Sequence, residues 1–187
     1  MKVKFGLKNV HIAPITAVSD SSYTYGDIIK VPGAVSISLE PQGDSNDFFA
    51  DNTKYFSAYA NNGYSGDLEI AMITDVIREK IFGEKKDSNG ALIENVSDTF
   101  TPFAFGFQIE GDEKGRRFWY YNCSCSRPKN EAKTMESSKE PSTDSITINA
   151  MARETDGKVR ALLTETTENK TAYDSFFNEV YEAVETV

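Results

Sequence analysis

The chain has 187 residues, a length that suits one domain able to bury roughly two-thirds of the surface that its unfolded form exposes. Its 29 acidic and 20 basic residues give a formal charge of −9, which argues against a protein that grips nucleic acid by neutralising phosphates. No run of about 18 apolar residues could span a bilayer, and the N-terminal segment lacks the continuous apolar stretch of a secretory signal. We therefore expect a soluble protein made in the cytosol.

Alternation of apolar and polar residues predicts the first strands. Residues 3–7 and 35–39 each place an apolar side chain at every second position, as a half-buried strand does. The same alternation returns in residues 54–60 and 68–72, and the Asn-Asn-Gly sequence of residues 61–63 is typical of a turn. We predict that residues 54–60 and 68–72 pair as a hairpin across this turn.

Residues 41–52, PQGDSNDFFADN, have the composition of a loop, with Pro, Gly, two Asn and three Asp. The same segment contains the adjacent rings of Phe48 and Phe49, and Tyr59 and Tyr64 lie at nearby expected turns. Composition alone does not explain so many rings on polar connections. Exposed rings in number usually mark a surface that binds a partner.

Local signals predict a short helix and a protruding hairpin in the middle of the chain. Thr74 is a candidate N-cap, and Ile77 and Ile81 lie one turn apart on a helix expected to end near Gly83. The Ser-Asn-Gly sequence of residues 88–90 is a strong turn signal. We expect a hairpin there that protrudes from the core.

The strongest strand signal covers residues 103–127. Aromatic or aliphatic side chains occupy every second position from Phe103 to Ile109, residues 111–115 form a polar turn, and residues 116–127 return with rings or thiols on both faces. This pattern predicts a long central hairpin that is covered on both sides. Its expected core residues are Phe103, Phe105, Phe107, Phe118, Trp119 and Tyr120.

The returning strand also combines arginines with rings, which can stack on single-stranded bases. Arg117, Trp119 and Tyr121 would share one face of this strand. Because the chain is acidic and such a pattern is ordinary for a central strand, packing within the protein is the preferred interpretation.

The C-terminal third begins with a polar connection over residues 129–145, followed by expected strands at residues 146–150 and 159–163. Apolar side chains then recur at helical spacing, which predicts an amphipathic helix that covers one sheet: Tyr173, Phe176, Phe177, Val180, Tyr181 and Val184. With seven or more strands and two helices, the expected fold is mainly β, an antiparallel β-sandwich or barrel in one domain over residues 1–187.

Side chains that would carry chemistry are sparse. The single histidine, His11, lies in a strand-like stretch, and the motifs of serine hydrolases, zinc proteases and nucleotide-binding loops do not occur. Cys123 and Cys125 are two residues apart on a strand, a spacing that favours free thiols over a disulfide or a zinc site. The acidic residues 44–51 lack the ligand order of a calcium loop. We therefore expect neither an enzyme nor a metal or cofactor site.

Five segments in order resemble the major tail protein family of long-tailed bacteriophages (siphophages) and related prophages. They are VKFGLKNVHIAPIT, YTYGDIIKVPGAVSISLEPQGDSNDFFADNTKYF, NNGYSGDLEIAMITD, FAFGFQIEGDEKGRRFWYYNCSCSRP and TMESSKEPSTDSITINAMAR. The resemblance implies a tail tube fold, a β-sandwich flanked by a helix, and assembly into hexameric rings that stack around a lumen for double-stranded DNA. It implies no catalytic residue and no cofactor. Some relatives carry an additional immunoglobulin-like domain at the C-terminus, and we expect none here.

The resemblance also implies positions for the contacts. A long loop early in the chain reaches the neighbouring ring in this family, and here the candidate is Glu40 to Thr53. Its expected ring-to-ring contacts are Asp44, Asp47, Phe48, Phe49 and Asp51. The implied partners are further copies of the chain and other tail proteins such as the tape measure and the tail terminator, in a virion tail assembled in the bacterial cytoplasm. Net negative charge would let DNA slide through the lumen without specific binding.

Two alternatives remain open from the residues. The first is a monomeric β-sandwich module that binds a carbohydrate or another ligand through its aromatic loops. The second is an enzyme whose pair of acids the sequence does not reveal.

Overall fold

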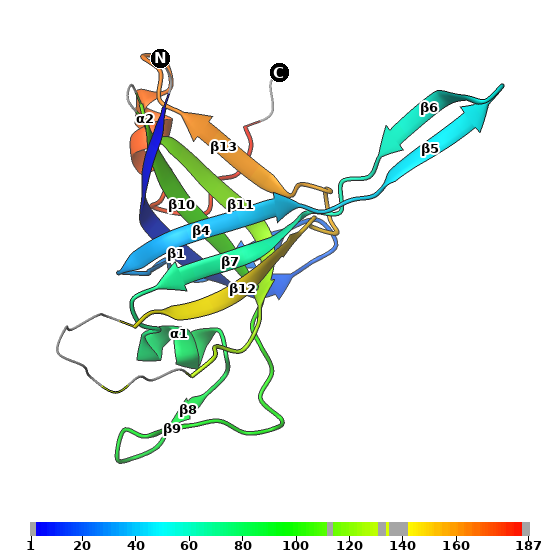
Figure 1. The fold of residues 1–187 in the computed structure, drawn as a ribbon. Helices are drawn as coiled ribbons and strands as arrows, with labels where there is room; N and C mark the ends of the chain where they lie inside the picture. Colours follow the sequence, from blue (N-terminus) through cyan, green and yellow to red (C-terminus); the bar gives the residue numbers. More distant parts are fainter. Residues whose placement is uncertain (1–2, 112–113, 131–133, 135–141, 185–187) are drawn as a thin grey trace.

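The computed structural model describes residues 3–111, 114–130, 134 and 142–184. Strands dominate these residues, and two short helices accompany them (Figure 1). The helices are α1 (Asp75–Lys80) and α2 (Lys170–Ser175). The strands are β1 (Lys4–Val18), β2 (Tyr23–Tyr25), β3 (Ile29–Lys30), β4 (Ala34–Pro41), β5 (Ser45–Ala50), β6 (Thr53–Tyr59), β7 (Tyr64–Ile70), β8 (Lys85–Lys86), β9 (Leu92–Ile93), β10 (Phe103–Gly111), β11 (Arg116–Cys125), β12 (Asp144–Met151) and β13 (Arg160–Thr164).

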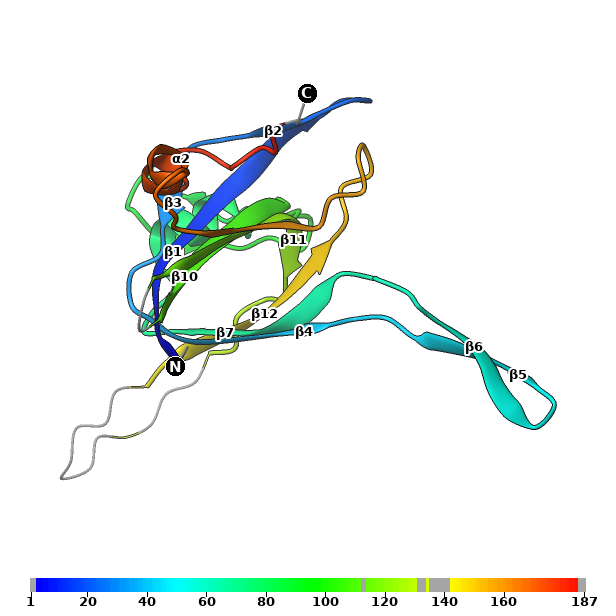
Figure 2. The same cartoon turned by 90° about the horizontal axis from the view of Figure 1, so that it is seen from above.

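Antiparallel pairing joins nine strands in the order β2-β1-β10-β11-β12-β7-β4, with β13 beside β11 and β3 beside β1. Strand β11 changes partner along its length, because residues 116–120 pair with β13 and residues 122–125 pair with β12. The sheet therefore folds over at β11 into two layers. Figure 2 shows β4, β7 and β12 facing β1 and β10, an arrangement consistent with the predicted β-sandwich.

The β10–β11 hairpin lies at the centre of the molecule, as the sequence predicts. The six rings expected in its core are all buried, with Phe103, Phe105 and Trp119 fully so. One face packs into the cluster between the layers, and the other face, with Trp119 and Tyr121, packs into a second cluster below the C-terminal segment. Gly106 is paired with Trp119, and a Cβ at Gly106 would lie 2.8 Å from the indole ring. The glycine therefore makes room for the tryptophan.

Most other predicted elements are present. The expected strands at residues 35–39 and 146–150 lie within β4 and β12, and those at residues 3–7 and 159–163 each begin one residue before β1 and β13. Helix α1 follows Thr74 and is followed by Gly83 with a φ of 78°, in the left-handed region that favours glycine after a helix. The turn at residues 88–90 separates the short strands β8 and β9, which protrude below α1 in Figure 1. Among the described residues, no helix is long and apolar enough to span a membrane.

In residues 41–63 the structure differs from two predictions. The expected loop at residues 41–52 is largely strand β5, and β6 pairs with β5 instead of with β7, so the predicted hairpin of residues 54–60 with residues 68–72 is wrong. The reason is the turn chemistry. Asp51 and Asn52 have φ values of 51° and 59°, the combination that closes a two-residue hairpin turn, so the chain reverses there.

The Asn-Asn-Gly segment that was expected to turn instead continues a ladder. The N–H of Gln42 donates to the carbonyl of Gly63 at 2.8 Å, and the N–H of Asn62 donates to the carbonyl of Gln42 at 2.9 Å. These bonds connect the β4–β7 pair to the β5–β6 pair. The result is one long ribbon of two strands.

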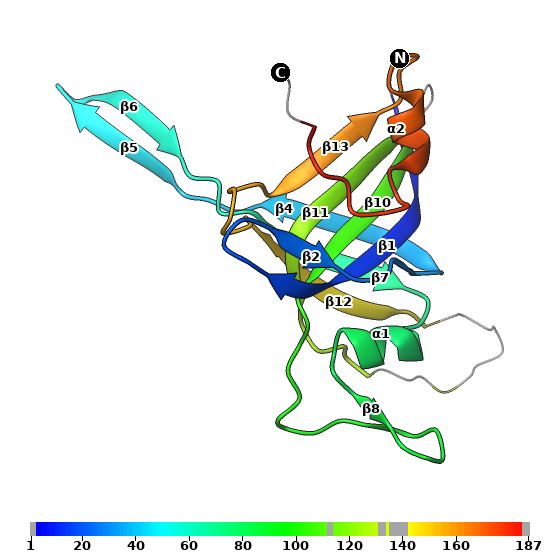
Figure 3. The same ribbon diagram turned by 180° about the vertical axis from the view of Figure 1, so that it is seen from behind.

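The C-terminal segment is less helical than the sequence predicts. The amphipathic helix expected across residues 173–184 is helical only to Ser175, and residues 176–184 have no helical assignment. They run over β10 and β11 (Figure 3). The apolar stripe is nevertheless used for burial, since Tyr173, Phe176 and Val180 are buried. Side chains of β11 donate to the backbone carbonyls of Phe176 and Tyr181, which a longer helix would use for its own hydrogen bonds.

Candidate functional site

The first candidate site is a projecting arm, residues 42–63, which contains β5 and β6. It leaves the ends of β4 and β7 and extends away from the two layers in all three ribbon views (Figures 1 to 3). With nine residues between Pro41 and the turn at Asp51, it reaches roughly 30 Å at the rise of an antiparallel strand. The arm is far too long to be a simple surface turn.

Large aromatic side chains of the arm are exposed. Phe49 and Phe56 are 63% and 60% exposed, and Tyr55 and Tyr59 are 77% and 78% exposed. Rings of this size are stabilised by burial, and an isolated two-stranded ribbon is marginally stable in water. This arm therefore has the properties of a surface that binds a partner.

The five residues predicted as ring-to-ring contacts all belong to the arm. Asp47 accepts hydrogen bonds from Lys54 Nζ at 2.8 Å and Ser57 Oγ at 2.7 Å, and the Lys54 bond, followed by that of Ser57, lowers the pKa of its carboxyl. Asp51 is exposed in the turn. Phe49 is exposed beside that turn, and Asp44 lies at the base, where its carbonyl accepts from the N–H of Ala60 at 3.2 Å. The side chain of Phe48 lies outside the described part of the structure.

Sequence reasoning missed half of this surface. Tyr55 and Phe56 come from β6, a strand that alternation predicts correctly at residues 54–60 but for which the turn signal predicts the wrong partner, so its rings are not expected beside Phe49. Tyr59 belongs to the arm as an exposed ring. Tyr64, also expected at a loop, instead packs on Tyr120 with ring centroids 5.3 Å apart.

The base of the arm is closely packed. A Cβ at Gly43 would lie 1.9 Å from the carbonyl oxygen of Ala60, and one at Gly63 would lie 2.0 Å from the carbonyl oxygen of Ala150. Both glycines have positive φ, 153° and 93°. Backbones this close to one another fix the direction in which the arm leaves the sandwich.

The second candidate surface is the outer face of β4, β7 and β12, here called the polar face. Cross-strand pairing sets its nine residues in three rows of three, Ser36–Glu69–Ser145, Ser38–Asp67–Thr147 and Glu40–Ser65–Asn149. Hydroxyls bind the central carboxylates, with Thr147 donating to Asp67 at 2.7 Å and Ser36 donating to Glu69 at 3.0 Å. Thr143 also donates to Glu69. The Thr143 bond, followed by that of Ser36, lowers the pKa of the Glu69 carboxyl. The face has three carboxylates and no cation among its nine positions.

The C-terminal strap, residues 170–184, covers the far side of the β10–β11 hairpin. Three alternating side chains of β11 donate to its backbone carbonyls. Arg117 donates to the carbonyl of Tyr173, Trp119 to that of Phe176 at 2.8 Å, and Tyr121 to that of Tyr181 at 2.9 Å. The shared face of Arg117, Trp119 and Tyr121 is thus used for packing within the protein, as preferred from the sequence.

A charged cluster fastens the end of the strap. Arg153 is 4% exposed and bonds Asp156 and Glu182, with closest N···O distances of 2.5 Å to each. Its guanidinium lies over the ring of Tyr121 at 4.4 Å. Burial works against the charged form of Asp156, but the bonds from Arg153 and Lys158 outweigh it and lower the pKa of Asp156 to about 2. Burial raises the pKa of the neighbouring Tyr25 to about 12.

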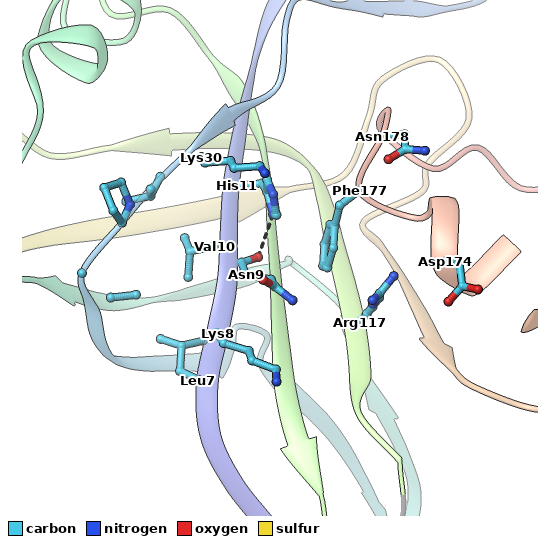
Figure 4. A pocket seen from close by; sticks show the side chains of 14 residues that line it. Leu7, Lys8, Asn9, Val10, His11, Lys30, Arg117, Asp174, Phe177 and Asn178 are labelled. Atoms are coloured by element: carbon cyan, nitrogen blue, oxygen red, sulfur yellow. Dashed lines mark hydrogen bonds between the residues drawn. The ribbon is translucent and has the colours of Figure 1, made fainter. Parts of the chain in front are cut away.

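A pocket of about 540 Å³ lies between β1, the chain that leads into β4, and the strap (Figure 4). His11 is buried in its wall, with Nδ1 2.7 Å from the carbonyl oxygen of Asn9, so Nδ1 carries the proton, and its ring stacks on Phe177 at 4.6 Å. Burial, together with the charges of Lys30 and Arg117, lowers the pKa of His11 against the opposing bond to Asn9. None of the described residues that line the pocket is a serine, threonine or cysteine that could act as a nucleophile.

The two cysteines are the remaining chemical groups with a possible reactivity in the part of the chain that the structure describes. Cys123 and Cys125 are free thiols, as predicted. Burial raises the pKa of both, that of Cys125 to about 12, which makes them poor nucleophiles. Within the described residues, no group of three or more His, Cys, Asp or Glu side chains could hold a metal ion.

No protein-family model matches the chain, and no curated protein matches it.

Proposed function

We propose that this chain is a subunit of a bacteriophage tail tube, which assembles as hexameric rings stacked around a lumen for double-stranded DNA. The family resemblance of five ordered segments suggests this function, and the projecting arm is the observation that carries it. An arm of roughly 30 Å with four exposed rings needs a surface on another molecule. A neighbouring ring supplies that surface.

Free strand edges support lateral contacts within a ring. Among the described strands, β4 pairs only with β7 and β13 pairs only with β11. Each therefore has a row of backbone groups on its outer side that a strand of another subunit can bind. Pairing of such edges between six subunits would close a ring and remove them.

The polar face is the surface that we assign to the lumen. Its hydroxyls and carboxylates carry no positive charge with which to bind phosphates. A basic wall would release counterions from DNA and hold it at each ring, whereas this face leaves DNA hydrated and mobile. The net charge of −9 acts in the same direction.

The second candidate function, a monomeric ligand-binding module, has one observation in its favour, the pocket beside His11. The oligomeric state separates the two functions. Sedimentation velocity of the purified chain over a wide concentration range tests the proposal, and the tail tube function requires growth into hexamers and larger species. A chain that stays monomeric at every concentration contradicts it and favours the binding module.

A further inference from the structure

We infer that the pocket beside His11 is the receptor for the arm tip of a second copy of this chain, with Phe49 and Asp51 as the inserted side chains. This inference rests on the proposed function, because it names the place where the arm of one subunit lands on the next.

The first argument is charge. Three cations line the pocket, Lys8, Lys30 and Arg117, against one carboxylate, Asp174. Lys8 pairs with Glu110, and Asp174 pairs with Lys170 at 3.1 Å. No carboxylate in the described part of the chain pairs with Lys30 or Arg117, whose guanidinium donates to the neutral oxygens of Gln108 and Tyr173. In a chain of net charge −9, two cations left without carboxylates mark a place where an acidic group can bind.

The arm supplies the complementary charge. It carries Asp44, Asp47 and Asp51 against the single cation Lys54. Lys54 already pairs with Asp47, and Asp51 lies exposed at the turn that forms the tip. The charged group at the tip of the arm is therefore a carboxylate.

The second argument is shape and polarity. The pocket combines its cations with apolar side chains, including Val31 and Phe177, and its volume of about 540 Å³ accommodates a ring together with a carboxylate. Phe49 is 63% exposed and lies two residues before Asp51. A ring and an acid so close together match a pocket that offers Phe177 beside Arg117 (Figure 4).

The third argument is position. Gly33 and Ala34, at the start of β4, line the pocket, and the arm begins after Pro41, at the other end of the same strand. Figures 1 and 2 show the arm pointing away from β1 and α2, so a subunit cannot fill its own pocket. Two complementary surfaces at opposite ends of one molecule make a head-to-tail contact. Such a contact continues from copy to copy and builds a stack.

A charge swap in the full-length chain tests the inference. Asp51→Lys and Lys30→Glu are each expected to weaken self-association, measured by sedimentation velocity, by about tenfold or more. The double variant is expected to recover association to within about threefold of the wild type, because the exchanged charges attract again. Lys85→Glu is the matched control, an exposed lysine on β8 far from the pocket, and it should not rescue Asp51→Lys.

A covalent test gives the geometry directly. Asp51→Cys combined with Asn178→Cys, which places a thiol at the pocket rim, should give a ladder of disulfide-linked multimers on mild oxidation. Asp51→Cys alone controls for reaction with the native thiols. Two results overturn this inference alone: single variants that associate as the wild type does, or a double variant that merely adds the two losses. A wild-type chain that never associates overturns the proposed function and this inference together.

Discussion

The indole N–H of Trp119 donates a hydrogen bond to the carbonyl oxygen of Phe176 at 2.8 Å, across 57 residues of sequence. This bond joins the central β10–β11 hairpin to the strap that covers it. Both residues are buried, with 0% and 1% exposure, so water cannot replace either partner. The strap is therefore part of the core as well as its cover.

Trp119→Phe removes this bond while keeping an aromatic ring. The carbonyl of Phe176 would remain buried without its donor, and we expect a loss of about 1 to 3 kcal/mol in the free energy of unfolding. Urea unfolding followed by circular dichroism measures it. Tyr55→Phe, which changes an exposed hydroxyl on the arm, should alter stability by less than about 0.5 kcal/mol. An unchanged midpoint for Trp119→Phe would show that the strap is not fastened in this way.

Arg153→Met should detach the end of the strap. Removing one partner of a buried ion pair commonly costs about 3 to 5 kcal/mol. Here Asp156 and Glu182 are 29% and 52% exposed and regain water, so we expect about 2 kcal/mol. Lys170→Met, which removes an exposed pair with Asp174, serves as the control and should leave the unfolding midpoint close to that of the wild type. Equal losses in the two variants would contradict the structural role of Arg153.

Stability should fall in mild acid because of His11. Its pKa is lowered in the folded state, chiefly by burial, so the unfolded chain binds the proton more readily below its ordinary pKa of 6.5. The free energy of unfolding should therefore decrease as the pH falls below about 6.5, by at most about 1.4 kcal/mol per pH unit. His11→Gln should flatten the dependence between pH 7 and pH 5. An identical slope in wild type and variant would exclude His11 as the cause.

Asp156 acts in a lower range of pH. Its pKa of about 2 lies below its ordinary value of 3.8, so its stabilising contribution is present above pH 3.8 and is lost as the pH falls toward 2. The two effects can thus be separated in one titration of stability against pH.

The polar face should repel DNA through its carboxylates. Asp67→Lys with Glu69→Lys should leave assembly intact and create binding of double-stranded DNA that weakens steeply with salt. Retention of DNA by assembled protein in a filter assay measures this change. If the variant tubes retain no more DNA than the wild type, the polar face does not line the lumen.

Local patterns predicted most strands, because alternation reports which side chains face the core whether the partner strand is near in the sequence or, as for β1 with β10 and β12 with β7, far away. The arm shows where this fails. Two turn signals compete, at residues 51–52 and 61–63, and the φ values of Asp51 and Asn52 decide between them only once the backbone is built. The C-terminal helix fails for another reason. Its apolar spacing is helical, but Trp119 and Tyr121 on β11, about 60 residues away, donate to its backbone carbonyls, which then do not form helical hydrogen bonds.

The pocket could not have been predicted from any one segment. Its walls come from residues 7–11, residues 30–34, Arg117 and the strap, which only the folded chain brings together. The arm surface was partly predictable, since Phe49 and its acidic neighbours are adjacent in the sequence. The rings of β6 join them through a register that the sequence does not reveal.

Electron microscopy of the purified wild-type chain at high concentration tests the central claim most directly. The proposed function predicts hollow tubes of uniform width, built from stacked rings of six subunits. Single particles of monomer size at every concentration, without rings or tubes, would contradict it.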